Sequence, residues 1–102
     1  MVNRLDLDEK LREFLGSSNV YYQPPESVKL KYPCIVYEKY LANSEYADDL
    51  TYTFTFSYQV TIIDKNPDSD LVKRFPYAFK KCKWNRHFTS DNLNHDVFVV
   101  FN

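Results

Sequence analysis

A strict two-residue alternation through residues 50–63 constrains the fold of this chain more than any other feature. Successive side chains of an extended strand point to opposite faces, so the pattern predicts one long strand with an apolar face and an uncharged polar face. The apolar face must be covered, most simply by helices, while the polar face can stay in water or meet another polar surface. The apolar set is Tyr52, Phe54, Phe56, Tyr58, Val60 and Ile62, and the polar set is Thr53, Thr55, Ser57, Gln59 and Thr61.

The first covering helix is predicted over residues 4–15, where apolar side chains recur on one stripe: Leu7, Leu11, Phe14 and Leu15. Asn3 can cap the start of this helix, and Asp8 and Arg12 stand one turn apart in the favourable order. Gly16 stands where the residue after a helix takes the left-handed conformation. The only glycine of the chain therefore has a structural role.

A second helix is predicted to start at Asn66-Pro67, because Asn66 can cap a helix and Pro67 suits its first position. The regular helix is expected to end or bend near Pro76, whose ring would clash with the carbonyl of Val72. Tyr77-Ala78-Phe79 is expected to continue the apolar surface in a looser turn.

The remaining segments are predicted to be short strands and loops. Strands are expected over 19–22, 34–40, 81–89 and 94–101, with polar loops over 26–33 and 41–49. The last strand is apolar throughout residues 97–101, which indicates burial on both faces. Plain alternation in 81–89 would put Trp84, Arg86 and Phe88 on one face. The order α-β-β-β-α-β-β predicts one α+β domain over residues 1–102, with two helices on one face of a mixed, mostly antiparallel sheet.

Composition excludes several classes of protein. With Gly16 alone, neither of the glycine-rich phosphate-binding motifs can be written. Thirteen Lys and Arg residues against 14 Asp and Glu give a net charge of −1, so there is no overall basic excess for nucleic acid or anionic lipid. No apolar run approaches the roughly 20 residues of a membrane span, and the N-terminus lacks the apolar core of a signal peptide. Cys34 and Cys82 are expected to be reduced thiols, since they show no metal or redox spacing.

One stretch near the C-terminus contains residues that could bind a metal ion or act in catalysis. Asp91, His95 and, across a hairpin, His87 could form a metal site, which leaves a small metal-assisted hydrolase as an alternative function. The structural interpretation is stronger, because Asp91 and the neighbouring asparagines are turn formers and adjacent strand residues such as His95 and Asp96 face opposite ways. We therefore expect no catalytic residue, metal ligand or cofactor, and the chain is not expected to be an enzyme.

Residues 80–88 combine basic and aromatic side chains. Such a segment can bind single-stranded nucleic acid, which gives a second alternative function, or it can be an edge strand protected by lysine. It can also meet the acid-rich segment 45–49 of a neighbouring copy. The candidate subunit-interface residues are accordingly Glu45, Asp48, Asp49, Lys80, Lys81, Lys83 and Arg86.

Four segments, in this order, carry a resemblance to a known family. They are Asn19-Val20-Tyr21-Tyr22-Gln23-Pro24-Pro25, Lys31-Tyr32-Pro33-Cys34-Ile35-Val36-Tyr37, Tyr58-Gln59-Val60-Thr61-Ile62-Ile63-Asp64 with Asn66-Pro67-Asp68-Ser69, and Asp91-Asn92-Leu93-Asn94-His95-Asp96-Val97-Phe98. In these segments the chain resembles the tail-completion proteins of long-tailed bacteriophages, also described as tail-terminator-like or head–tail joining proteins. The motif residues are expected to be structural: Tyr21, Gln23, Pro24, Pro25, Tyr32, Pro33, Asn92, Asn94, His95 and Asp96.

The resemblance implies an α+β fold and a ring, commonly of six copies, at the head-proximal end of the tail tube. Such a ring ends tube polymerisation and docks to the head connector. The implied partners are other copies of the chain, the tail tube protein and the head–tail connector protein, with DNA only as cargo in the channel and no membrane. The implied location is the head–tail interface of the virion, after assembly in the host cytoplasm.

Overall fold

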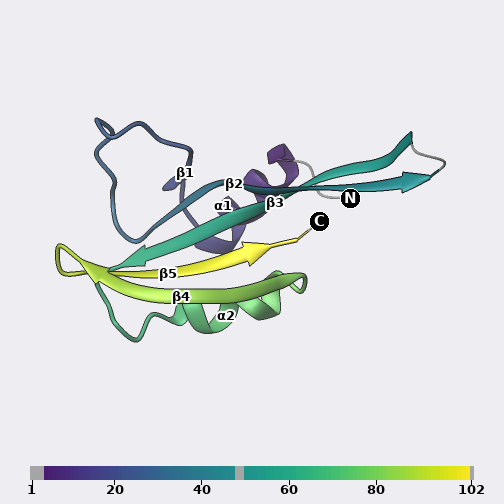
Figure 1. Ribbon diagram of the computed structural model, residues 1–102. Helices are drawn as coiled ribbons and strands as arrows, with labels where there is room; N and C mark the ends of the chain where they lie inside the picture. The colour runs from purple at the N-terminus through teal and green to yellow at the C-terminus, as the bar shows by residue number, and fades with distance from the viewer. Residues whose placement is uncertain (1–3, 48–49, 102) are drawn as a thin grey trace.

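The computed structural model describes residues 4–47 and 50–101, and within them the side chains of residues 4–42 and 56–101. This part of the chain forms two helices and one five-stranded sheet with strand order β1-β2-β3-β5-β4 (Figure 1). β1 and β2 are parallel, and the other neighbouring strands are antiparallel. The elements are α1 (Arg4–Leu15), β1 (Val20–Tyr22), β2 (Cys34–Ala47), β3 (Leu50–Asp64), α2 (Asp70–Ala78), β4 (Cys82–Ser90) and β5 (Leu93–Val100). The predicted α+β class and element order are confirmed.

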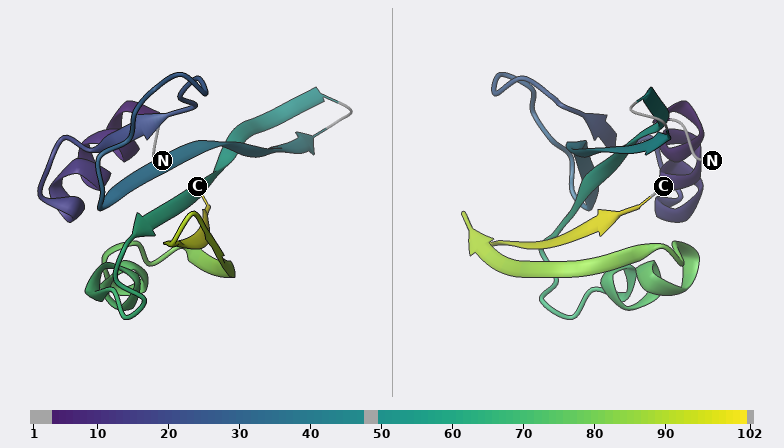
Figure 2. Two further views of the ribbon diagram at one scale, coloured as in Figure 1. Left: turned by 90° about the vertical axis from the view of Figure 1, so that its left-hand side faces the viewer. Right: turned by 45° about the vertical axis from the view of Figure 1, so that its right-hand side comes forward.

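Both helices lie on one face of the sheet, which we call the helix face (Figure 2). A single core forms there from α1, α2 and the inward side chains of β1, β2, β3 and β5: Leu7, Leu11, Val20, Ile35, Tyr37, Tyr58, Val60, Ile62, Leu71, Phe75, Phe79, Phe98 and Val100. The described apolar positions of the long alternating strand are therefore covered by helices, as the pattern predicted.

Helix α1 begins and ends within the predicted range, and its stripe supplies Leu7 and Leu11 to the core. Gly16 takes a φ of +77°, and its N–H donates to the carbonyl of Arg12 at 2.9 Å. This is the left-handed helix end that glycine adopts without steric cost. The proposed cap, Asn3, lies outside the described residues.

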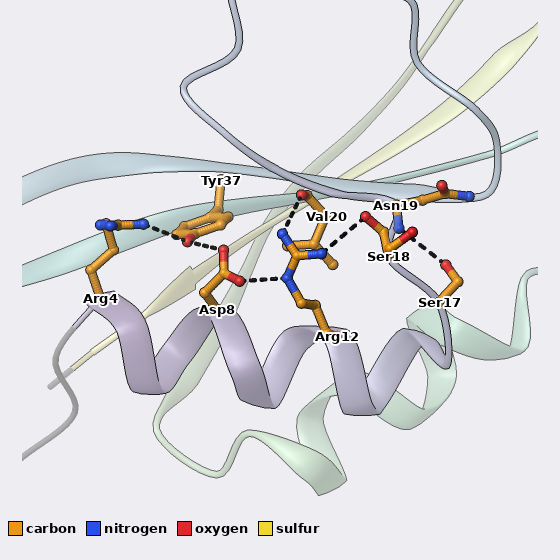
Figure 3. A network of polar contacts seen from close by, with 8 residues as sticks. All are labelled: Arg4, Asp8, Arg12, Ser17, Ser18, Asn19, Val20 and Tyr37. Atoms are coloured by element: carbon orange, nitrogen blue, oxygen red, sulfur yellow. Dashed lines mark hydrogen bonds and ion pairs between the residues drawn. The ribbon is translucent and has the colours of Figure 1, made fainter.

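A polar network ties α1 to β1 and β2 (Figure 3). The buried Tyr37 hydroxyl donates to Asp8 Oδ2 at 2.5 Å, and Arg12 Nε donates to Asp8 Oδ1 at 2.6 Å. The Arg12 guanidinium also donates to the carbonyls of Ser18 and Val20, at 3.2 and 3.3 Å. The Tyr37–Asp8 bond and the bonds from Arg12 to the two carbonyls therefore hold the helix on β2 and β1, while the Arg12–Asp8 bond within the helix orients both charged side chains.

Helix α2 starts later than predicted. Ser69 is its N-cap, and the Ser69 hydroxyl accepts from the N–H of Leu71 at 3.2 Å. The prediction that Asn66 caps the helix was wrong, because the Asn66 side chain accepts from the N–H of Asp68 and so closes a local turn before the helix begins. The helix also continues past Pro76 to Ala78, since a proline in the last turn removes only one backbone bond.

The segment 41–47 is strand and not the loop that was predicted. β2 continues to Ala47 opposite β3, and the ladder passes two register shifts, between Lys39 and Leu41 and between Glu45 and Tyr46. Turn-forming residues there are accommodated because an antiparallel partner satisfies their backbone groups. The resulting two-stranded extension projects past the rest of the sheet (Figure 1), and the molecule measures 51 × 31 × 24 Å. We call residues 41–47 and 50–57 the arm.

The C-terminal hairpin turns through Asp91 and Asn92, with φ values of +52° and +64°. Two successive left-handed residues make the tight turn that suits a twisted hairpin, and Asp and Asn tolerate that conformation. β5 lies between β3 and β4 and is buried from Asp96 to Val100, so the predicted burial on both faces is confirmed for residues 97–100. It was wrong for Phe101, which follows the strand and is exposed.

A bulge in β4 changes which side chains share a face. The register pairs Trp84 with Phe98 and Arg86 with Val97, so Asn85 is the extra residue. The prediction that Trp84, Arg86 and Phe88 share a face was therefore wrong. Trp84 lies on the helix face, whereas Arg86 and Phe88 lie on the opposite one, because a bulge shifts the alternation by one residue.

Candidate functional site

The sheet surface opposite the helices, here called the open face, is apolar in its middle and basic at the β4 edge. The register assigns it side chains from four strands: Val36 and Glu38 of β2; Gln59, Thr61 and Ile63 of β3; His95, Val97 and Val99 of β5; and Lys83, Arg86 and Phe88 of β4. The hydroxyl-rich side of the long strand thus meets apolar neighbours, and Thr61 there is half-buried. The open face therefore combines apolar and polar side chains.

The loop of residues 23–33 projects on the side of the sheet away from the helices (Figure 2, right). Gln23 fixes its start: its N–H donates to the carbonyl of Tyr37 at 2.9 Å, and its Oε1 accepts from the N–H of Lys39 at 3.4 Å. Gln23 takes a φ of +44°, which is uncommon for a residue other than glycine. At the other end the Tyr32–Pro33 peptide is cis and leads directly into β2. Both ends of the loop are therefore defined by residues of the predicted motifs.

A pocket of about 330 Å³ lies between this loop and the open face. Its lining is mostly apolar and comes from both sides: Pro24, Pro25, Glu26, Val28 and Leu30 of the loop, and Val36, Thr61, Ile63, Phe88 and His95 of the sheet. Pro24, Pro25 and His95 belong to motif segments about 70 residues apart in the sequence, and the fold brings them to one place. We call this cavity the motif pocket.

His95 contributes an imidazole ring to the lining of the motif pocket. Its ring stacks on Phe88, with 4.5 Å between centroids and an interplanar angle of 8°. Partial burial lowers the pKa of His95, and this effect outweighs the raising effect of nearby Asp91. A neutral imidazole held against apolar side chains suits an apolar or aromatic occupant better than an anion.

The three residues of the hydrolase alternative do not converge. His87 is paired with Asp96 and Phe88 with His95, so the two histidines lie on opposite faces of the hairpin. Asp91 lies in the turn between the strands. Within residues 4–47 and 50–101, no group of three or more His, Cys, Asp or Glu side chains is placed to hold a metal ion.

The four basic interface candidates are exposed: Lys80, Lys81, Lys83 and Arg86. Lys83 and Arg86 lie on the open face, where the Arg86 guanidinium sits over the Phe88 ring at 5.5 Å. Phe88 is thus contacted by both Arg86 and His95, and its side chain is still 40% exposed. Of the acidic candidates, Asp48, Asp49 and the side chain of Glu45 lie outside the described part of the structure.

The arm is the second feature that could contact another molecule. The last residue of β2 paired with β1 is Tyr37, and the first residue of β3 paired with β5 is Tyr58. In the described chain, residues 41–47 of β2 and 50–55 of β3 therefore have no strand partner other than each other. Tyr40 and Leu41 at its root are 45% and 53% exposed. A two-stranded ribbon with exposed apolar side chains is marginally stable alone in water, so the arm suits contact with another molecule.

The other motif residues have structural positions. Asn92 forms the hairpin turn, and Asn94 Nδ2 donates to the carbonyls of Asp64 and Lys65, at 3.3 Å each. Asp96 lies on the helix face and accepts from Trp84 Nε1 at 3.5 Å. Tyr21 is the middle residue of β1, and its partner in the register is Val36.

Sequence reasoning missed most of the motif pocket. Val36, Ile63 and Phe88 were assigned to strands, and nothing in their local pattern indicated that the loop 23–33 would fold over them. The sequence signal that could have revealed the pocket is the alternation of Val28 and Leu30 with the charged residues of that loop. Apolar side chains in a polar loop indicate that the loop packs against another apolar surface.

Comparison with known proteins adds no assignment: neither a family model nor a curated protein matches this chain. Neither of the two helices in the described residues is long and apolar enough to cross a membrane.

Proposed function

We propose that this chain is a structural assembly protein that forms a closed homo-oligomeric ring in a bacteriophage tail. The observation that carries the proposal is the arm, a β-ribbon whose two strands pair only with each other over residues 41–47 and 50–55 of the described chain. A protruding ribbon of this kind can add to the surface or the sheet edge of a neighbouring copy. The chain's net charge of −1 would allow copies to pack without strong mutual repulsion.

Charge complementarity supports contact between copies. The arm carries Glu45 and is followed by Asp48 and Asp49, whereas the edge strand β4 presents Lys83 and Arg86 on the open face. The arm, formed by β2 and β3, and the edge strand β4 are different parts of the molecule, so contact between them would join copies head to tail. A heterologous contact of this kind closes into a ring when the rotation between copies is suitable.

The place of the ring in the particle follows from the resemblance in the four motif segments. On that basis we assign a ring of six copies to the head-proximal end of the tail tube in the virion, after assembly in the host cytoplasm. There it would end the tube and join it to the head connector, with DNA passing through the channel as cargo. No enzymatic step, cofactor or membrane contact is part of this proposal.

Light scattering on the purified protein, followed by electron microscopy, tests ring formation. Lys81→Glu with Lys83→Glu is expected to weaken the ring, whereas Lys65→Glu with Lys73→Glu makes the same change of charge away from β4 and should leave it intact. A strictly monomeric wild-type protein at high concentration and low salt would refute the proposal.

The place in the particle needs a separate test. Particles produced without this protein should have over-long or unattached tails. Normal, joined tails in its absence would contradict the assignment. Binding of a single-stranded oligonucleotide that falls steeply with salt would favour the nucleic-acid alternative.

A further inference from the structure

The motif pocket lies at one end of the β2–β3 ladder, and the pair formed by Ala47 and Leu50 lies at the other. Val36 and Ile63 line the pocket near one end, and Ala47 and Leu50 pair at the other. Eleven residues of β2 separate Val36 from Ala47, which is roughly 36 Å at 3.3 Å per residue. The arm of one molecule therefore cannot reach its own pocket.

The surroundings of the motif pocket carry more positive than negative charge. Lys29 and Lys31 flank Leu30 on the loop, and Arg86 lies over Phe88 of the pocket wall. The acids on this side are Glu26, in the pocket lining, Asp91, whose charge acts on His95, and Glu38, which accepts from Gln59 Nε2 at 3.0 Å. With Lys83 on the same face, the cations outnumber the acids.

The arm tip, residues 45–50, has the complementary composition. Its sequence Glu-Tyr-Ala-Asp-Asp-Leu contains three acids and three apolar residues. Three acids would face a rim that is rich in lysine and arginine, and a tyrosine or leucine would suit a mostly apolar cavity of about 330 Å³.

We propose that the motif pocket is the docking site for the arm tip of a second copy of this chain. The inference rests on the proposed ring and specifies its contact. Each copy offers a tip at one end and receives a tip at the other, which is the arrangement a head-to-tail ring requires. The motif residues Pro24, Pro25 and His95 then shape the receiving site.

Cysteine cross-linking tests this contact. In a Cys82→Ala background, Val28→Cys places a thiol at the pocket mouth, where Val28 is 37% exposed, and Ala47→Cys places one at the arm tip. Cys34 can remain, because it is fully buried and burial raises the pKa of its thiol to about 12. The two new sites are too far apart for a short bifunctional maleimide to join within one molecule, so every product is intermolecular.

The double variant should give a ladder of covalent multimers that ends at the ring size. The control pairs Ala47→Cys with Tyr77→Cys, whose side chain is 84% exposed on α2, and it should give no ladder. A ring seen by light scattering without the Val28–Ala47 ladder would overturn the docking site while leaving the ring proposal in place. Absence of any ring would overturn both.

A substitution gives an independent readout that does not depend on cross-linking. Val28→Asp adds a negative charge at an exposed position of the pocket mouth, so the fold should persist while the acidic tip is repelled. Loss of the apolar contact alone is expected to weaken self-association by about tenfold or more, and Val28→Leu should preserve it. Unchanged self-association of Val28→Asp, with a circular dichroism spectrum like that of the wild type, would overturn the proposal.

Discussion

Replacing Tyr37 with phenylalanine tests whether the polar network of Figure 3 stabilises the seating of α1 on the sheet. The substitution keeps the buried ring and removes only the hydroxyl, which donates to Asp8 Oδ2 at 2.5 Å and accepts from Arg4 Nη1 at 3.4 Å. A hydrogen bond to a charged partner contributes about 1.5–3 kcal/mol, while the long bond from Arg4 adds little. We expect Tyr37→Phe to lower the free energy of unfolding by about 2 kcal/mol at pH 7.

The loss of stability in Tyr37→Phe should depend on pH, because Asp8 titrates. Desolvation raises the pKa of Asp8, but hydrogen bonds from Tyr37 and Arg12 outweigh it, so the folded-state pKa lies below its usual value. A carboxylate with a lowered pKa contributes stability that is present above its unfolded-state pKa and is lost as the pH falls through the folded-state value. The difference between wild type and Tyr37→Phe should therefore shrink to about 1 kcal/mol near pH 2, where a neutral hydrogen bond remains.

The assay is urea unfolding followed by far-ultraviolet circular dichroism, because Trp84 is 52% exposed and its fluorescence would report the transition poorly. Tyr58→Phe is the matched control: Tyr58 packs against Tyr37, with 6.2 Å between ring centroids, but is not part of the Figure 3 network. The reasoning would be refuted by a loss below about 0.5 kcal/mol at pH 7, well under the expected contribution. A loss of equal size at pH 7 and pH 2 would refute the charge-assisted part.

Three further substitutions or treatments test separate features. Gly16→Ala should lower the free energy of unfolding by about 1–2 kcal/mol, as measured by urea unfolding. The φ of Gly16 is +77° and an added Cβ meets nothing within 4 Å, so any loss of stability reports backbone strain alone. An unchanged midpoint would refute the left-handed helix end. At pH 8 a thiol reagent should modify half-buried Cys82 and leave buried Cys34 intact until the protein unfolds; equal rates in the folded protein would contradict the burial. Replacing residues 43–54 with Asn-Gly should abolish self-association and leave the thermal midpoint within a few degrees, since the pairing of Cys34–Ala42 of β2 with Phe56–Ile63 of β3 is retained. A ring that still forms would exclude the arm from the interface.

Much of the fold could be predicted from local pattern. The alternation in residues 50–63, the stripe of α1 and the apolar run at 97–100 each depend on which face of an element is buried. The structure confirms the stripe of α1 and the burial of the other two segments over residues 56–63 and 97–100, because side-chain periodicity indicates directly which face of an element is buried. The errors fell where tertiary pairing overrides local preference. Residues 41–47 read as a loop but are held in β2 by β3, and a bulge at Asn85 moved Trp84 to the helix face.

The sequence by itself determined the α+β class, the element order and the single left-handed helix end at Gly16. Only the tertiary structure decided that His87 and His95 lie on opposite faces and that Pro24, Pro25 and His95 meet at one pocket. The physical reason is range: periodicity reports which side of an element is buried, whereas register and loop docking depend on contacts between residues far apart in the chain. The pocket and the arm tip lie at opposite ends of one ladder for the same reason, and that separation underlies the proposed contact between copies.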